Sequence, residues 1–123
     1  RDPLVPNRVS VHEIVGEVDG RVCLIVDDMI DTGRTIVQAA NALKAAGATK
    51  VVVAATHAIF SDPAVELLKG ASIDSVVVTD TLPVPEEKRF ESLTILPIAP
   101  LIAQAIHEVF DDGSVTSMFD GAA

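Results

Sequence analysis

The 123-residue sequence is poor in basic residues. Nine lysines and arginines stand against 18 aspartates and glutamates, which gives a net charge of −9 at pH 7. Because no basic stripe interrupts this acidic balance, it argues against nucleic acid and against anionic membranes as partners. A phosphate ligand would need hydrogen-bond donors gathered at one place.

Cysteine and long apolar runs are also scarce. Cys23 is the only cysteine, so no internal disulfide can form, and its position in an apolar run predicts a buried, reduced thiol. No apolar segment approaches the roughly 18 residues that a membrane-spanning helix needs, and the charged start does not resemble a signal peptide. We therefore expect a soluble, cytoplasmic protein.

Length and composition predict one globular domain over residues 1–123, since 49% of the residues are hydrophobic. The chain opens RDPLVPN, without an initiator methionine and with two prolines. We interpret residues 1–7 as a mobile loop and expect the chain to be a piece of a longer protein.

The first part of the chain predicts a hairpin followed by a helix. Residues 13–18 and 21–27 are β-rich and flank Asp19-Gly20, a strong hairpin signal, so the first strand should be antiparallel to the second. From Gly33 the apolar residues recur at helical spacing as far as Gly47, which predicts a helix ended by glycine.

Buried strands and helices alternate in the rest of the chain. We expect a short helix over 62–69 capped by Ser61, a solvated loop with a turn of helix over 81–91, and a helix over 100–110 that buries Ile102, Ile106 and Val109. Continuous apolar runs predict buried parallel strands at residues 50–56, 75–79 and 93–96.

This order is typical of an α/β fold with a central, mostly parallel sheet and right-handed crossovers. Ligands in such sheets bind beyond the carboxyl ends of the strands. Asp27, Thr56 and Asp80 should all lie at such ends.

The most informative stretch is VCLIVDDMIDTGRT, residues 22–35, in which a strand delivers two adjacent carboxylates and then enters a helix. A helix start offers backbone N–H groups and the positive end of the helix dipole to a phosphate. Thr32 and Thr35 add hydroxyl donors, Gly33 permits close approach, and Arg34 can add a positive charge.

The acidic end of the same stretch suits a sugar. Asp27 and Asp28 can accept hydrogen bonds from vicinal hydroxyls or draw in a hydrated magnesium ion. The alternative is that Asp31 only caps the helix and that the aspartate pair only solubilises a strand end. The stretch matches neither G-x-x-x-x-G-K-[ST] nor G-x-G-x-x-G, so the common nucleotide and dinucleotide motifs are excluded.

The stretch resembles the phosphoribosyl-diphosphate signature shared by type I phosphoribosyltransferases and ribose-phosphate diphosphokinases. The segments DPLVPN, ATHAIFSDPAVELL, VVVTDTLPVPEEK and SVTSMFDG resemble the C-terminal domain of the diphosphokinases, so the resemblance covers nearly the whole chain. It implies a three-layer type I phosphoribosyltransferase-like fold.

The resemblance also implies an activity, namely transfer of diphosphate from Mg-ATP to O1 of ribose 5-phosphate, with release of AMP. Asp27 would bind the ribose hydroxyls, residues 31–35 (Asp31, Thr32, Gly33, Arg34 and Thr35) would hold the 5-phosphate, and Asp28 would support the acidic wall. Arg34 departs from the family, which usually has a small residue there.

Further expectations rest on the resemblance alone. Arg1 would be the arginine of a flexible catalytic loop that includes residues 1–8, with its partner lysine outside the chain. The adenine site and the magnesium-binding histidine and aspartate would come from a missing N-terminal domain, so no metal ligand is assigned. Family members form homo-oligomers, and Ser114, Thr116 and Phe119 resemble a segment of an inhibitory site between subunits.

Alternative functions remain at this point. The central stretch alone would suit a purine or pyrimidine phosphoribosyltransferase, and the missing lysine would suit a non-catalytic regulatory paralogue. We expect the isolated chain to bind ribose 5-phosphate weakly without turnover. His57 is interpreted as a hydrogen-bonded histidine at a strand end, and His107 as solvated.

Overall fold

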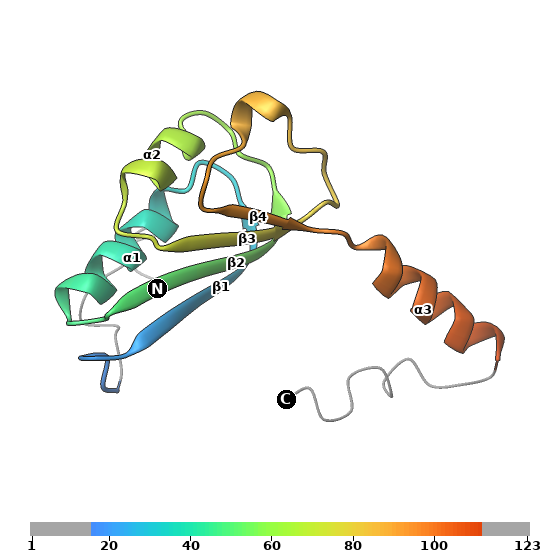
Figure 1. The fold of residues 1–123 in the computed structure, drawn as a ribbon, viewed down its shortest axis with the longest axis horizontal. Helices are drawn as coiled ribbons and strands as arrows, with labels where there is room; N and C mark the ends of the chain where they lie inside the picture. The colour runs from blue at the N-terminus through green and yellow to red at the C-terminus, as the bar shows by residue number, and fades with distance from the viewer. Residues whose placement is uncertain (1–15, 112–123) are drawn as a thin grey trace, which may run out of the picture.

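The computed structural model describes residues 16–111, which form a parallel sheet with helices (Figure 1). The predictions for residues 1–15 and for residues 112–123 lie outside the described residues. The elements in chain order are β1 (Val22–Ile30), α1 (Arg34–Ala45), β2 (Lys50–Ala58), α2 (Ala64–Gly70), β3 (Ser75–Thr79), the 3₁₀ turn η2 (Glu86–Lys88), β4 (Leu93–Leu96) and α3 (Ala99–Phe110).

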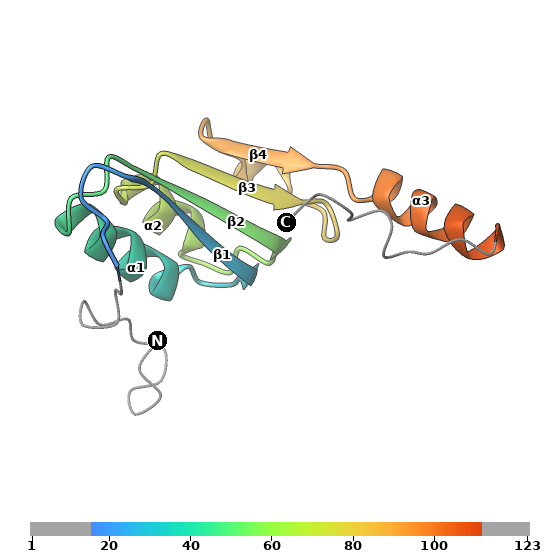
Figure 2. The same cartoon turned by 90° about the horizontal axis from the view of Figure 1, so that it is seen from below.

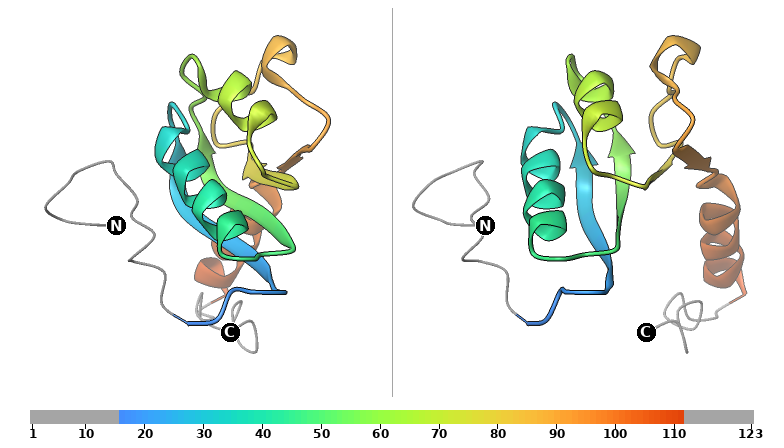
Figure 3. Two further views of the ribbon diagram at one scale, coloured as in Figure 1. Left: turned by 90° about the vertical axis from the view of Figure 1, so that its left-hand side faces the viewer. Right: turned by 60° about the vertical axis from the view of Figure 1, so that its left-hand side comes forward.

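The four strands lie in the order β1-β2-β3-β4, and each neighbouring pair is parallel. Right-handed crossovers that always step in the same direction place their helices on the same face of a sheet. Figures 2 and 3 show α1 and α2 together on one face. The α/β class and the parallel sheet are therefore confirmed.

The core lies between this face and the two helices. Its side chains alternate along the strands, as the period of two in a strand requires. The fully buried members include Ile30, Val51, Val53, Phe60, Val76 and Val78.

The opposite face of the sheet is not covered by any described residue. Val22, Leu24 and Val26 of β1 are 61–70% exposed on this face, although parallel sheets are ordinarily covered on both sides. The described residues thus form two layers, and the third layer of the predicted fold is not seen among them.

Helix α3 has the predicted length, but its predicted burial is wrong. Ile102, Ile106 and Val109 are 52–63% exposed, because α3 continues past β4 away from the sheet (Figure 2). The N–H of Ile98 donates to Oδ1 of Asp80 at 2.8 Å, which holds the start of α3 beside the end of β3. Periodicity correctly predicted an apolar stripe, but it does not determine what that stripe packs against.

The predicted antiparallel hairpin is not supported. Asp19-Gly20 does form a turn, closed by the Arg21 N–H to the carbonyl of Val18 at 3.0 Å, but residues 16–18 are not a strand. The turn binds the connection between α1 and β2 instead: the Gly20 N–H donates to the Gly47 carbonyl at 2.9 Å. An Asp-Gly pair specifies the turn itself and leaves the partner of the following strand open.

The remaining elements follow the sequence closely, with corrections at three of them: β1, β2 and α2. Strands β1 and β2 continue to Ile30 and Ala58, three and two residues past their predicted ends. Asp27 and Thr56 therefore lie within the strands rather than at their ends. Helix α1 ends before Gly47, whose φ of 103° is the left-handed conformation expected after a helix. Strands β3 and β4 have the predicted bounds.

Helix α2 begins later than predicted, and its N-cap is Pro63 with no side-chain hydrogen bond, so the predicted cap by Ser61 is wrong. Ser61 contributes only its backbone carbonyl, which accepts the Ala64 N–H at 2.8 Å.

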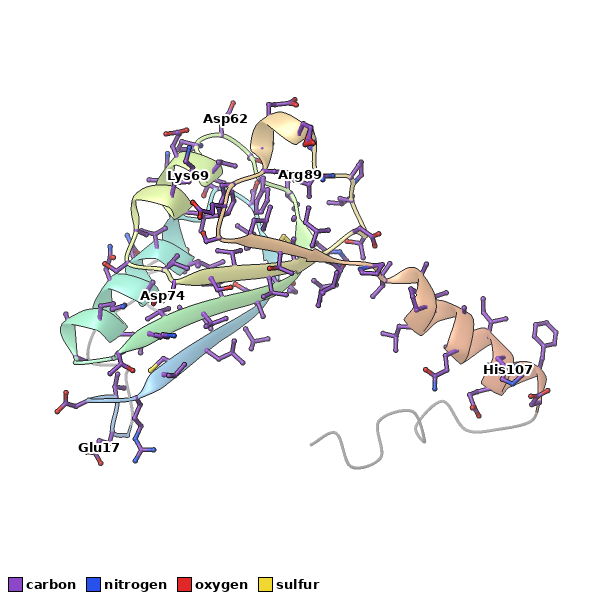
Figure 4. All side chains as sticks on the ribbon, viewed as in Figure 1. Glu17, Asp62, Lys69, Asp74, Arg89 and His107 are labelled. Carbon is purple, nitrogen blue, oxygen red and sulfur yellow. The ribbon has the colours of Figure 1, made fainter. Side chains whose placement is uncertain are left out.

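Asp74 joins three elements at the amino-terminal edge of the sheet (Figure 4). Its Oδ2 accepts the Val51 N–H at 2.8 Å and lies 3.2 Å from the Nζ of Lys44, at the end of α1. The hydrogen bond from Val51 and the neighbouring ammonium of Lys44 lower the pKa of the Asp74 carboxyl.

We predict that Asp74→Asn lowers the Tm slightly at neutral pH, because asparagine can still accept the Val51 N–H but loses the attraction to Lys44. A lowered folded-state pKa stabilises the protein above the unfolded pKa, and this gain is lost as the pH falls through the folded pKa. The Tm difference between the two proteins should therefore shrink on acidification. Thermal unfolding followed by circular dichroism, with the exposed Glu91→Gln as control, measures it; a constant difference at all pH values would contradict the prediction.

Candidate phosphate-binding site

A cleft of about 560 Å³ lies where β1 ends and α1 begins. It brings together every residue for which ribose 5-phosphate binding was predicted. Arg1, Ser114, Thr116 and Phe119 lie outside the described residues. The cleft is lined by Asp27, Asp28, Met29, Asp31, Thr32, Gly33, Arg34, Thr35, Ile36 and Gln38.

The acidic end of the cleft is formed by Asp27 and Asp28, both exposed. Oδ1 of Asp27 accepts the N–H of Asp28 at 2.8 Å, which orients the first carboxylate along its own backbone. A carboxylate has two oxygens and about four acceptor sites. The carboxylate of Asp27 therefore keeps acceptor capacity for the hydroxyls of a ligand.

The other end of the cleft is the start of α1. The residue before its first turn is Gly33, with a φ of 81°, and no side chain caps the helix. This excludes the alternative in which Asp31 serves only as the N-cap. Helix α1 has 12 residues, and its first turn lines the cleft. The positive end of its dipole therefore points at the cleft.

The loop between β1 and α1 is supported from behind by the segment that follows β2. The carbonyl of Ile30 accepts the N–H groups of both Ile59 and Phe60 at 3.0 Å. Gly33 is buried, and a Cβ placed there would lie 3.8 Å from Ala64 and Leu68. Sequence reasoning missed this support, because no pattern in residues 59–68 points to β1.

A second polar group occupies the carboxyl ends of β2 and β3. Nδ1 of His57 lies 2.8 Å from Oγ1 of Thr81, and Thr79 donates its hydroxyl to the carbonyl of Thr56 at 2.7 Å. These side chains bond to one another and to the backbone, and none lines the cleft. The interpretation of His57 as a hydrogen-bonded histidine at a strand end is confirmed.

His107 is exposed on α3 (Figure 4), and its Nε2 lies 2.9 Å from Asp111 one turn later. Over residues 16–111, no three histidine, cysteine or acidic side chains group closely enough to hold a metal ion. None of the helices in this part of the chain has the length and apolar content needed to cross a membrane.

Gly33→Ala tests the left-handed helix start. The contacts leave room for a methyl group, so the expected cost is the backbone strain at positive φ, about 1–2 kcal/mol of unfolding free energy. The matched control is Gly70→Ala, where φ is ordinary and nothing lies near the added Cβ. Urea unfolding measures both, and equal stabilities would contradict the prediction.

A parallel α/β sheet with a cleft at the carboxyl end of a strand is the arrangement of the open α/β class of domains, in which ligands characteristically bind at that edge. Residues 4–120 match the family described as "Phosphoribosyl synthetase-associated domain", and the chain belongs to this family.

Two curated relatives carry the same enzyme name. A "Ribose-phosphate pyrophosphokinase" of Streptomyces avermitilis is 58% identical over 98% of this chain and 37% of its own length. One of Mycobacterium tuberculosis is 53% identical over the whole chain and 38% of its own length. The crystal structure of a Mycobacterium smegmatis phosphoribosylpyrophosphate synthetase superposes with a TM-score of 0.75 at 52% identity, over 80% of this chain and 33% of that one.

The chain thus spans little more than a third of the length of the curated relatives it matches. The more specific prediction, that it is their C-terminal domain, is not supported by these comparisons.

Proposed function

We propose that this chain is the ribose 5-phosphate-binding part of a ribose-phosphate pyrophosphokinase. The observation that carries the proposal is the cleft with two carboxylates at one end and the start of α1, with Gly33 at its N-cap, at the other. A sugar phosphate has matching ends, since it offers hydroxyl donors and a dianion. The name shared by the relatives supports the same activity.

Each lining residue has a role in this proposal. The 5-phosphate lies at residues 31–35 and accepts hydrogen bonds from backbone N–H groups and from the hydroxyls of Thr32 and Thr35. Asp27 accepts hydrogen bonds from the ribose hydroxyls, and Asp28 forms the acidic wall beside it. Arg34 is exposed at the cleft and adds positive charge near the phosphate.

Magnesium is the cofactor of the proposed reaction, together with ATP. Mg²⁺ is typically bound by one or two carboxylates plus water and substrate oxygens, and Asp27 and Asp28 fit that donor set. The bound ion would neutralise charge on the diphosphate. Asp27 and Asp28 would then hold the ribose and the cation side by side.

In the proposed reaction, the O1 hydroxyl of ribose 5-phosphate attacks the β-phosphorus of ATP and releases its proton to solvent. The bond from that phosphorus to the oxygen bridging it to the α-phosphate breaks, and AMP leaves with that oxygen. Phosphoryl-type transfer depends mainly on positioning and charge stabilisation. This chain supplies the positioning of the acceptor. The catalytic role of Arg1, the regulatory role of Ser114, Thr116 and Phe119, and assembly into homo-oligomers are proposed on the family resemblance.

The isolated chain should bind ribose 5-phosphate and release no AMP from Mg-ATP. Asp27→Asn should weaken binding about tenfold, because a hydrogen bond to a charged acceptor contributes about 1.5 kcal/mol or more. Isothermal titration calorimetry measures the affinity, with the exposed Asp62→Asn, outside the cleft, as the matched control. Ribose-dependent release of AMP by the chain alone, or equal affinities of the two variants, would refute this assignment.

The partner that completes the enzyme is, in this proposal, the two thirds of the family polypeptide that this chain does not match. The chain offers two apolar surfaces for it. One is the uncovered sheet face, with Val22, Leu24 and Val26, and the other is the stripe of α3 that includes Ile106 and Phe110. Apolar side chains that gather on one exposed face of a protein commonly mark an interaction site.

Mixing the chain with the rest of the family polypeptide tests whether the two bind each other. The chain should co-purify with a polypeptide made of the Streptomyces avermitilis residues outside the 120 aligned ones, and the mixture should release AMP in the presence of ribose 5-phosphate and Mg-ATP. Leu24→Asp should abolish co-purification, because it places a charge on the buried face of the complex. Asn41→Asp, on the exposed side of α1, should not. Dimerisation of the chain alone, abolished by Leu24→Asp, would instead identify a second copy as the occupant.

A further inference from the structure

Phe60, in the connection between β2 and α2, combines deep burial with an unusual backbone. Its side chain is 1% exposed, and its φ is 51°. Bulky residues other than glycine rarely adopt this left-handed conformation, which carries a cost in free energy. Such residues persist only where their surroundings hold them, and they cluster at functional sites.

Three contacts hold Phe60. Its carbonyl accepts a hydrogen bond of 2.7 Å from the Nζ of Lys88, its ring packs on Phe90 at 6.2 Å between centroids, and its N–H donates to Ile30 at 3.0 Å. The bond from Lys88 is charge-assisted and partly buried, so it is stronger than an ordinary surface contact.

Lys88 comes from the run Glu86-Glu87-Lys88-Arg89, which the sequence analysis interpreted as solvated. Hydrogen bonds within the segment shape this run: the Lys88 N–H donates to the carbonyl of Pro85 at 2.9 Å, and Nε of Arg89 donates to the carbonyl of Val84 at 3.1 Å. Val84 is itself buried in the core. These bonds and the buried Val84 anchor the backbone from which the Lys88 side chain reaches Phe60.

The other end of this set of contacts is formed by residues 31–35, which we call the phosphate loop because the proposed function places the 5-phosphate there. Ile30, which accepts from Ile59 and Phe60, is fully buried and immediately precedes Asp31. The helix that follows Phe60 packs behind Gly33. Consecutive contacts thus connect Lys88, Phe60 and Ile30 to the first residue of the loop.

We propose that Lys88 is a positioning residue for the phosphate loop, acting through the backbone of Phe60 and Ile30. Its ammonium holds the Phe60 carbonyl and with it the left-handed conformation of Phe60, so that the turn whose N–H groups meet the Ile30 carbonyl stays closed where the loop begins. The effect on ligand binding rests on the proposed function, because it presumes that residues 31–35 hold the phosphate of ribose 5-phosphate.

Removal of the ammonium should let Phe60 relax to negative φ and should loosen the loop. In the ligand-free 123-residue chain, Lys88→Met should shift the backbone amide resonances of residues 31–35. It should also weaken ribose 5-phosphate binding about three- to tenfold in calorimetry. Lys88→Arg, which restores a cationic donor to the Phe60 carbonyl, should recover both.

Lys69→Met is the matched control, because Lys69 is an exposed lysine of α2 (Figure 4) whose loss removes the same charge. It should leave the amide resonances of the loop and the affinity unchanged. Lys88→Gln, which keeps a polar side chain, provides a second variant if Lys88→Met does not fold.

The outcomes separate the two proposals. If the unsubstituted chain does not bind ribose 5-phosphate, the proposed function fails, while the amide resonances still report whether Lys88 positions the loop. The positioning role is wrong if Lys88→Met and Lys88→Gln shift the amide resonances of residues 31–35 no more than Lys69→Met does. It is also wrong if Lys88→Arg restores neither these resonances nor the affinity for ribose 5-phosphate.

Discussion

The backbone carbonyl of Ile30 is the point on which the site depends. It ends β1 inside the core, and it accepts two N–H groups from the connection that follows β2. A buried carbonyl must find such partners, because an unpaired one costs free energy comparable to a lost hydrogen bond. These two hydrogen bonds fix the end of β1 relative to β2 and α2. Asp31, the next residue, begins the loop that leads from β1 to α1.

The one-sided arrangement of α1 and α2 follows from strand order, and it explains both the cleft and the uncovered surface. Each crossover moves to the next strand in the same direction, so right-handed connections place α1 and α2 on one face. The carboxyl ends of all strands then share one edge, where the cleft opens. The same topology leaves Leu24 and its neighbours exposed on the other face, which no described residue covers.

The sequence predicted local features better than distant ones. The bounds of β3 and β4, the end of α1 before Gly47 and the residues of the cleft follow from apolar periodicity, glycine and the spacing of polar groups within one short stretch. The hairpin, the cap of α2 and the burial of Ile106 were predicted wrongly, since each depends on a partner that local pattern does not specify. The contacts of Lys88 were missed for the same reason: the sequence shows a charged run, and only the fold brings its ammonium to Phe60.

The charge distribution of the cleft also decides how a sugar phosphate can lie in it. The chain carries a net charge of −9, and Asp27 and Asp28 add two carboxylates at one end of the cleft. A phosphate dianion at that end would meet like charges, whereas at the start of α1 it meets the positive end of a 12-residue helix and the hydroxyl of Thr32. The hydroxyl groups of the sugar have the opposite preference, because they donate hydrogen bonds to the carboxylates of Asp27 and Asp28. In the proposed complex, only one orientation satisfies both ends, with the sugar toward Asp27 and the phosphate at the start of α1.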